Sequence, residues 1–372
     1  MALTCEMLDE ILCYLPVKSL LRCRCVSKGW CSLIDSTPFV RKHLRKALEC
    51  NAAGLVINEG GKFYLAEDFK SNLDGGDNDD DDAVAVEIID PLKTLLSGAD
   101  FVGSANGLVC VSQNNMNEFS VFNPSTRKSR KMPSAPPEFP RSFHMTETSL
   151  CGFGYDHVND DYNVVKIAEC YLQFRGIMAF VYSLKSNSWK RIQNVPVHNK
   201  IRFCGKWGMF GNGALNWLAI KNPINCSKII VGFDLGLEQF KEVPFPVIEG
   251  PFVNFNTRSV VSYGGSLCVL DKYPNSRIDV WICFLWEEWS ECTFGGGQLK
   301  AWYDIGSKTV KNVRIRVIPN QFDSHVFTHS LIPLNKDNPL QKPSQDKPQK
   351  EHHRRRDDYL SQGIQTEAVR YR

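Results

Sequence analysis

The stretch CGFGYDHVNDDYNVVKI, Cys151 to Ile167, followed by FVYSLKSNSWKRIQNVP, Phe180 to Pro196, decides the fold that we predict for this chain. Both runs are rich in β-branched and aromatic residues and are interrupted by short polar groups, which is typical of strands joined by tight turns. Asn159-Asp160 and Ser186-Asn187 stand where hairpin turns are needed, and short polar residues suit such turns. The stretch therefore predicts one unit of hairpin-connected strands.

Similar units recur on both sides of this one, from Gly103 to Pro133, from Gly211 to Pro246 and from Gly264 to Cys292. Leu235-Gly236 is the expected turn of the third copy. The equivalent aromatic residues follow one another at roughly 50 residues, the period of a kelch-type blade; they are Phe122, Tyr182, Phe233 and Trp281. A strand repeat of this length predicts a β-propeller.

The two ends of the repeat are irregular. Residues 54–69 indicate a hairpin around Gly60-Gly61 and residues 84–91 a further strand, which together suggest a divergent first blade. Residues 299–315 repeat only the outer half of the pattern, and residues 327–334 offer one more strand. We expect five to six blades, and the shortened stretch 289–298 leaves open whether the ring closes.

Two polar segments interrupt or follow the strands. The acidic run at 73–82, LDGGDNDDDD, has no apolar group to pack and predicts a flexible loop. Residues 335–372 are rich in Lys, Pro, Gln and Asp without apolar periodicity, and we expect them to be disordered. We therefore divide the chain into a helical domain at 1–45, a propeller at 52–334 and a tail at 335–372.

Short amphipathic helices are predicted before the strands. Leu8, Ile11, Leu12 and Leu15 share one helix face, which Pro16 ends. Three further short stripes follow, and Ser36 or Thr37 offers an N-cap before Pro38 for the last of them. About 40 residues in such short helices bury little apolar surface alone, so we expect a partner to complete their core.

The run MLDEILCYLPVKSLLRCRCVSKGWCSLIDSTPFVRKHL, residues 7–44, resembles an F-box of the plant type. That resemblance implies insertion of the helices into a Skp-type linker protein, which joins a cullin-RING ligase. It also implies the linker-contacting residues, which are Leu3, Leu8, Ile11, Leu15, Pro16, Leu20, Val26 and Trp30. The family usually opens with Leu-Pro, whereas Thr4 follows Leu3 here, which predicts a less rigid first contact.

The layout from Gly54 to Leu334 is similar to the F-box-associated, kelch-like domain behind plant F-boxes, a family that includes defence regulators and pollen S-locus F-boxes. The segments at 151–167 and 181–192 carry this likeness. It implies an α+β chain, a small helical F-box followed by an all-β propeller. The implied role is that of the substrate receptor of an SCF-type E3 ubiquitin ligase, an adaptor and not an enzyme, which holds an unknown client protein.

Charge and sequence motifs narrow the function classes. The net charge of +3 gives no strong attraction to nucleic acid or to an anionic membrane, so we expect neither as a partner. The chain carries no C-x-x-C pair, and we expect no metal and no cofactor. Asp156, Asp160 and Asp161 beside His157 form the closest acid cluster, which we interpret as turn chemistry and not as a catalytic site.

Two classes of function remain open from the sequence. The adaptor interpretation needs the helices to hold the linker while the propeller holds the client, in the cytoplasm, the nucleus or both. The alternative is a propeller-fold hydrolase or carbohydrate-binding protein for which the helices are only a cap. The two differ in whether residues 1–45 are needed for partner binding or only for stability.

Overall fold

The computed structural model describes four helices and the strands that follow them. The described residues are 5–50, 53–59, 62–66, 83–84, 86–88, 96–136, 147–170, 176–193, 195, 201–222, 227–243, 258–263, 266–272, 278–285, 288–294, 301–304, 309–312, 315–316 and 323–334. All of them belong to one compact unit, Met1–Leu334. The acidic run at 73–82 and the tail at 335–372 lie outside the described residues.

The predicted helices are present as α1 (Cys5–Leu12), α2 (Val17–Cys23), α3 (Lys28–Ile34) and α4 (Thr37–Glu49). The hydroxyl of Ser27 accepts the N–H of Trp30 at 3.1 Å, and Ser36 accepts that of Phe39 at 3.3 Å, so both serines cap helix starts. Pro16 precedes α2, where its missing N–H breaks no helical bond. The expected boundary at residue 45 falls inside α4.

The four helices, called the helical unit below, share one apolar core. Its buried members from the helices and the turn after α1 are Leu12, Cys13, Val17, Leu20, Ile34, Phe39 and Val40. Leu331, which follows the last strand, is also buried in this core. The helical unit is therefore completed by a residue from the other end of the described chain.

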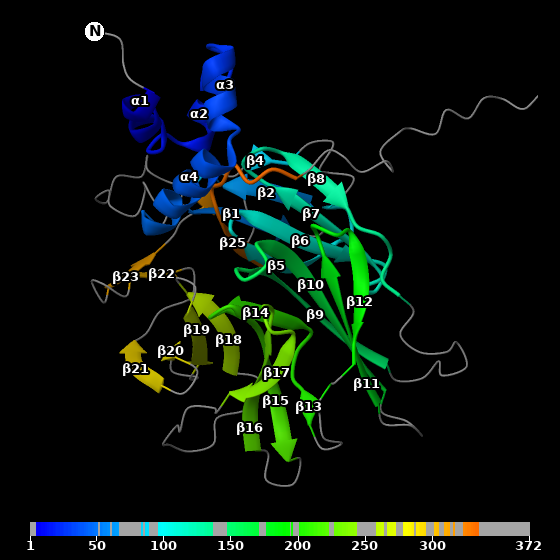
Figure 1. The fold of residues 1–372 in the computed structure, drawn as a ribbon. Coiled ribbons are helices and arrows are strands. Elements are labelled where there is room, and N and C mark those ends of the chain that lie inside the picture. Colours follow the sequence, from blue (N-terminus) through cyan, green and yellow to red (C-terminus); the bar gives the residue numbers. More distant parts are fainter. Residues whose placement is uncertain are drawn as a thin grey trace, which may run out of the picture. The chain divides into compact units, whose positions relative to one another are not determined.

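The strands form antiparallel sheets that match the predicted repeats (Figure 1). One sheet holds β5 (Asp100–Ala105), β6 (Leu108–Gln113), β7 (Glu118–Asn123) and β8 (Lys128–Lys131), and the next holds β9 (Glu147–Asp156), β10 (Asp161–Cys170), β11 (Gly176–Ser183) and β12 (Ser188–Ile192). This second sheet continues from β9 into β14 (Trp207–Gly211), β15 (Ala214–Asn222), β16 (Ser227–Asp234) and β17 (Gln239–Val243), with β13 (Arg202–Phe203) beside β15, so it has nine strands. A further sheet holds β18 (Arg258–Tyr263), β19 (Ser266–Lys272), β20 (Ile278–Leu285) and β21 (Glu288–Phe294).

The shortened region forms only part of a blade in the described chain. β22 (Ala301–Asp304) pairs with β23 (Thr309–Asn312) as a two-stranded sheet. β24 (Ile315–Arg316) pairs in parallel with β3 (Ala83–Val84). This agrees with the expectation that residues 299–315 repeat only half of the pattern.

The last strand closes the first sheet. β25 (Asp323–Thr328) pairs with β1 (Ala53–Glu59), followed by β2 (Lys62–Ala66) and β4 (Val86–Glu87) (Figure 1). This pairing joins the two ends of the β domain through backbone hydrogen bonds. The predicted strand at 327–334 is wrong in position, since β25 ends at Thr328 and the chain leaves the sheet there.

Side chains alternate between two cores on either side of each sheet, as the period of two in a strand requires. Val109 and Val111 of β6 pack toward the first sheet, whereas Leu108 and Cys110 pack toward the sheet of β9 to β12. Val165 of β10 packs in turn toward β15 and β16. Apolar layers thus lie between successive sheets, the arrangement expected of blades.

The hairpin turns use one repeated design. Asn123, Asp156 and Asp234 end their strands and accept hydrogen bonds from backbone N–H groups of the turn that follows. The last residue of each four-residue turn has a positive φ, and these residues are Arg127, Asp160, Asn187 and Glu238. Leu235-Gly236 lies in such a turn, as predicted, and the left-handed residue of that turn is Glu238.

The two halves of the nine-stranded sheet join through β9 and β14, where small residues let these strands meet. β14 pairs in parallel with β9, with Gly208 opposite Gly152. A Cβ added to Gly208 would lie 2.4 Å from the indole ring of Trp217. Only a residue without a side chain fits at this approach.

Candidate partner-binding surface of the helical unit

Apolar side chains stand exposed on and just after α1. Met7 is 54% exposed, Ile11 52% and Tyr14, in the turn that follows, 64%. Residues spaced by four lie on one side of a helix, so the side chains of Met7 and Ile11 point to the same side of α1. Val26, at the end of the α2–α3 connection, is 64% exposed. Such a group of exposed apolar side chains is characteristic of a contact surface for another protein.

The structure places the predicted linker-contacting residues in three classes. Ile11, Pro16 and Val26 are exposed. Leu8, Leu15 and Trp30 are partly buried and pack against the helical core. Leu20 is 0% exposed, so its side chain packs inside the helical core and is not part of the exposed surface. Leu3 lies outside the described residues.

Met7 and Tyr14 were not predicted as members of this surface. For Met7 the spacing to Ile11 carries a signal, because residues at i and i+4 share one side of a helix. The resemblance assigned residues by family position, and these two positions were not among them. Leu331 was also missed, and no local pattern could have paired it with the helices.

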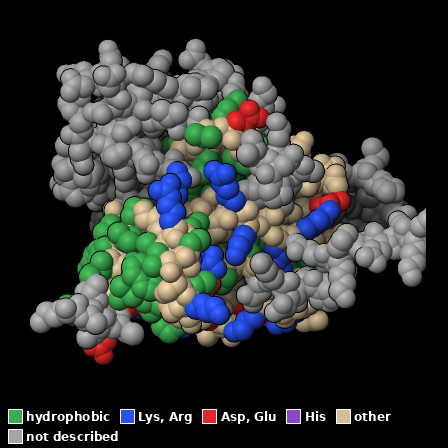
Figure 2. Space-filling model, turned by 90° about the horizontal axis from the view of Figure 1, so that it is seen from above, with side chains coloured by type: hydrophobic (Ala, Val, Ile, Leu, Met, Phe, Trp, Pro, Cys, Tyr) green, Lys and Arg blue, Asp and Glu red, His purple; other side chains and the backbone are tan. Residues whose placement is uncertain are grey.

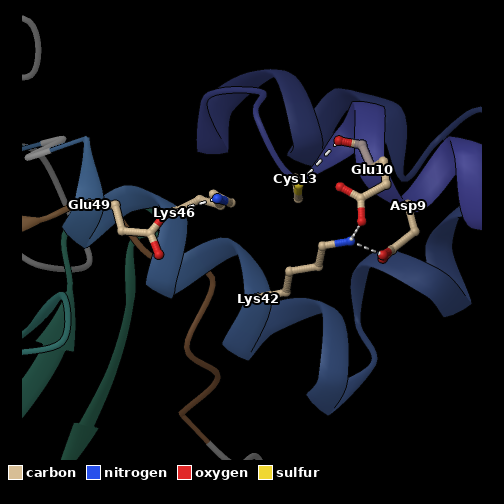
Figure 3. A network of polar contacts seen from close by, with 6 residues as sticks. All are labelled: Asp9, Glu10, Cys13, Lys42, Lys46 and Glu49. Carbon is tan, nitrogen blue, oxygen red and sulfur yellow. Dashed lines mark hydrogen bonds and ion pairs between the residues drawn. The ribbon is translucent and has the colours of Figure 1, made fainter.

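A polar network ties α1 to α4 (Figure 3). The ammonium of Lys42 lies 2.6 Å from Glu10 and is also paired with Asp9. Hydrogen bonds to these two carboxylates raise the pKa of Lys42. Lys46 pairs with Glu49 of α4 at 2.9 Å, and its ammonium also lies 5.6 Å from the centroid of the Tyr14 ring. The position of the exposed α1 side chains therefore depends on Lys42.

A buried histidine braces the turn between α1 and α2. The ring of His43 of α4 packs against the ring of Phe39. Its Nε2 lies 3.0 Å from the carbonyl oxygen of Leu15, so in neutral His43 the proton is on Nε2, which donates to that carbonyl. Burial lowers the pKa of His43, and the charge of His329 lowers it further. The neutral form of His43 is thus the one that the fold favours.

Basic side chains surround the apolar surface on the adjoining helices. Lys18, Arg22 and Lys28 are exposed on α2 and α3. In the view from above, Lys and Arg side chains are spread over the described part of the surface and acidic ones are few (Figure 2). Glu6 and Glu10 are exposed on α1, so charged side chains of both signs lie near the exposed apolar ones.

The acid cluster considered for catalysis serves the turns. Asp156 accepts backbone N–H groups of its own turn, and Asp161 accepts the N–H of Lys185 at 2.9 Å. Asp160 accepts the hydroxyl of Tyr155 at 2.6 Å and pairs with Arg41 of α4. Asp156 and Asp161 thus bond turn backbone, as the interpretation as turn chemistry requires, whereas the Asp160 side chain bonds Tyr155 and Arg41.

In the described part of the chain, no three His, Cys, Asp or Glu side chains gather as metal ligands would. Cys13 is buried in the helical core, and its thiol donates to the carbonyl of Glu10 at 3.1 Å. Burial raises the pKa of Cys13, which keeps the thiol protonated.

Comparison with known families agrees with the two parts of the fold. A model described as F-box domain matches residues 2–42, and one described as F-box associated beta propeller domain matches residues 92–317. The chain belongs to the F-box proteins that carry an F-box associated β-propeller. The exposed α1 and Val26 side chains lie within the matched F-box.

Plant relatives share this organisation along most of their length. The chain is 26% identical to F-box protein CPR1 of Arabidopsis thaliana, over 96% of this chain and 98% of that protein. It is 29% identical to F-box/kelch-repeat protein At3g23880 of the same plant, over 74% of each chain. The finer expectation of a defence-regulator or pollen S-locus type stays a prediction.

Solved structures resemble the chain only weakly. The six-bladed β-propeller lectin of Aleuria aurantia aligns with a TM-score of 0.31 and 13% identity, over 66% of this chain and 80% of the lectin. This likeness is too weak to support an argument about function. Within the described residues, no helix is both long enough and apolar enough to cross a membrane.

Proposed function

We propose that this F-box protein is the substrate-recognition subunit of an SCF-type E3 ubiquitin ligase. The helical unit binds a Skp-type linker protein and, through it, a cullin-RING ligase, while the β domain holds a client protein. The carrying observation is the set of exposed apolar side chains on α1 and at Val26, inside a segment that matches the F-box model.

The linker interface that we propose combines family positions with the observed exposure. Ile11, Val26 and Pro16 make direct contacts, together with the exposed parts of Leu8, Leu15 and Trp30. Met7 and Tyr14 extend the same surface. Leu20 holds α2 in place from within the core. Leu3 would add a contact at the start of the chain.

The protein contributes proximity and no bond-breaking chemistry in this role. Holding a client beside a ubiquitin-charged enzyme raises their effective concentration to about the millimolar range when the span fits. We assign the linker to the helices at 5–49 and the client to the sheets from residue 53 to residue 334. We expect the protein to act in the cytoplasm, the nucleus or both.

The test measures the affinity of the full-length protein for a purified Skp-type linker by calorimetry. We expect Ile11→Asp to weaken binding by roughly ten-fold or more, because a charge replaces an apolar anchor at the interface. Leu237→Asp is the matched control, since Leu237 is 59% exposed in a turn of the β domain. Linker binding that is absent from the wild type, or equal in Ile11→Asp and wild type, would reject the proposal.

The adaptor role is then tested in a reconstituted ligase. Full-length protein captured with linker and cullin should transfer ubiquitin to a client identified by proximity labelling while the ligase is inhibited. Ile11→Asp should lose this transfer and keep client binding, because the client contacts the β domain. Equal transfer by wild type and Ile11→Asp would contradict the division of labour.

A further inference from the structure

We infer that the segment His329–Leu334, called the strap below, completes the core of the helical unit and fixes that unit to the β domain. The linker-binding helices would then reach full stability only when the end of the β domain is in place. The inference concerns the stability and placement of the helices and does not depend on the identity of their partner.

One side of the strap is held by a buried amide. The side-chain Nδ2 of Asn123 lies 3.1 Å from the carbonyl oxygen of Ser330 and 3.1 Å from that of Ile332. Asn123 and Ser330 are fully buried. Buried polar groups that lose a partner are costly, so these contacts define where the strap runs.

The same amide group organises its own turn. Oδ1 of Asn123 accepts the N–H of Ser125 at 2.9 Å, and the hydroxyl of Ser125 lies 3.1 Å from Nδ1 of His329. The oxygen of this side chain therefore serves the β7–β8 turn, and its nitrogen serves the strap. A substitution that changes only the nitrogen separates the two roles.

The β5–β6 turn leaves no room beneath the strap. Gly107 has a φ of +84°, and a Cβ added there would lie 2.2 Å from the hydroxyl oxygen of Ser330 and 2.4 Å from the carbonyl oxygen of Thr328. The strap thus lies directly on this turn. Its path is set by backbone contact as well as by side chains.

The other side of the strap packs into the helices. Leu331 is buried in the cluster that contains Leu12, Val17 and Phe39. Ile332 packs against this cluster and also against the core between the sheets of β5–β8 and β9–β12. Leu334 is buried in that second core. The strap therefore links the two cores through consecutive residues.

The strap lies near the end of the β domain in the sequence, far from the helices whose core it completes. It follows β25 directly, and β25 pairs with β1, the first strand after α4. Helices made at the start of the chain therefore receive Leu331 only after the whole β domain has been synthesised. Small helical units depend on each buried apolar side chain, so an unfinished chain would offer a loosened linker-binding unit.

The test uses hydrogen exchange of full-length variants, read at the amides of α2 and α4 and, as an internal reference, at β15 and β16. We expect Leu331→Ser to speed exchange in the helices by about ten-fold or more and to leave the reference strands unchanged. Pro333→Ser is the matched control, because Pro333 lies in the same strap and is exposed. It should exchange like the wild type.

Asn123→Asp provides a second, isosteric variant. The carboxylate keeps an acceptor for the turn and replaces the donor to Ser330 and Ile332, so the helices should again lose protection. Unchanged helical exchange in both Leu331→Ser and Asn123→Asp, or an equal rise at β15 and β16, would overturn the inference. Linker affinity of the same variants is a separate measurement: a wild type that fails to bind the linker would reject the proposed function while the exchange result still stands.

Discussion

Lys42 of α4 reaches across to α1 and places its ammonium 2.6 Å from the carboxylate of Glu10, thirty-two residues earlier in the chain. The same ammonium also pairs with Asp9, so one side chain spans the gap between the last and the first helix (Figure 3). α1 carries the exposed Met7 and Ile11. The geometry of the proposed linker surface is therefore set partly by an ion pair.

Removing this cation should loosen α1. We expect Lys42→Gln to weaken linker binding by roughly two- to five-fold at low salt, and by less at high salt, because exposed ion pairs are screened. Affinity measured across a salt series checks this. Lys221→Gln is the control, since Lys221 pairs with Glu242 within the β domain. An equal loss in both variants would point to net charge and not to the α1 contact.

Leu20 and Ile11 should separate stability from binding. Leu20→Ala opens a cavity in the helical core and should cost about 2–5 kcal/mol of local stability. Ile11→Ala removes an exposed side chain and should change stability by about 0.5 kcal/mol or less. Hydrogen exchange at α2 measures both. If Ile11→Ala loosens the helices as much as Leu20→Ala does, Ile11 belongs to the core.

His43 should make the helices sensitive to acid. Its pKa is lowered from 6.5 in the folded chain, so the unfolded chain binds the proton first as the pH falls. The stabilisation that neutral His43 contributes to the folded chain is fully present above pH 6.5. It declines as the pH falls from 6.5 toward the lowered pKa of His43 in the folded chain. Helical exchange, corrected for the intrinsic pH effect, should be less protected at about pH 5.5 than at about pH 7.5.

His43→Gln supplies the comparison for this pH effect. The amide of Gln can still donate toward the carbonyl of Leu15 but does not titrate, so the variant should lose most of the acid sensitivity. The groups that face His43 are Phe39, the Leu15 carbonyl and, electrostatically, His329. An unaltered pH profile in His43→Gln would assign the effect to another group.

Gly208 should not tolerate a side chain. Gly208→Ala forces a methyl group against the ring of Trp217, which is itself buried, and should destabilise the β9–β14 junction by about 1–3 kcal/mol. Gly29→Ala is the contrast, since its nearest contact is Ser27 at 3.7 Å within an exposed part of α3. Chemical unfolding of the two variants checks this, and equal midpoints would contradict the packing argument.

The sequence by itself determined the elements and their order. Apolar spacing along Leu8 to Leu15 encoded an amphipathic helix, and Ser36 marked the start of α4, because helical periodicity and capping act within a few residues. The strand pattern at 151–167 likewise encoded β9, its turn and β10. The F-box and propeller resemblance, stated on such local segments, is confirmed by the family matches.

Only the tertiary structure decided how distant segments meet. The pairing of β25 with β1, the entry of Leu331 into the helical core and the burial of Leu20 depend on which surfaces come together after the chain has folded back. The exposure of Met7 and Tyr14 has the same origin. Local patterns report on neighbours within one element, whereas β25 and Leu331 contact residues hundreds of positions earlier, and such contacts are set by shape and packing.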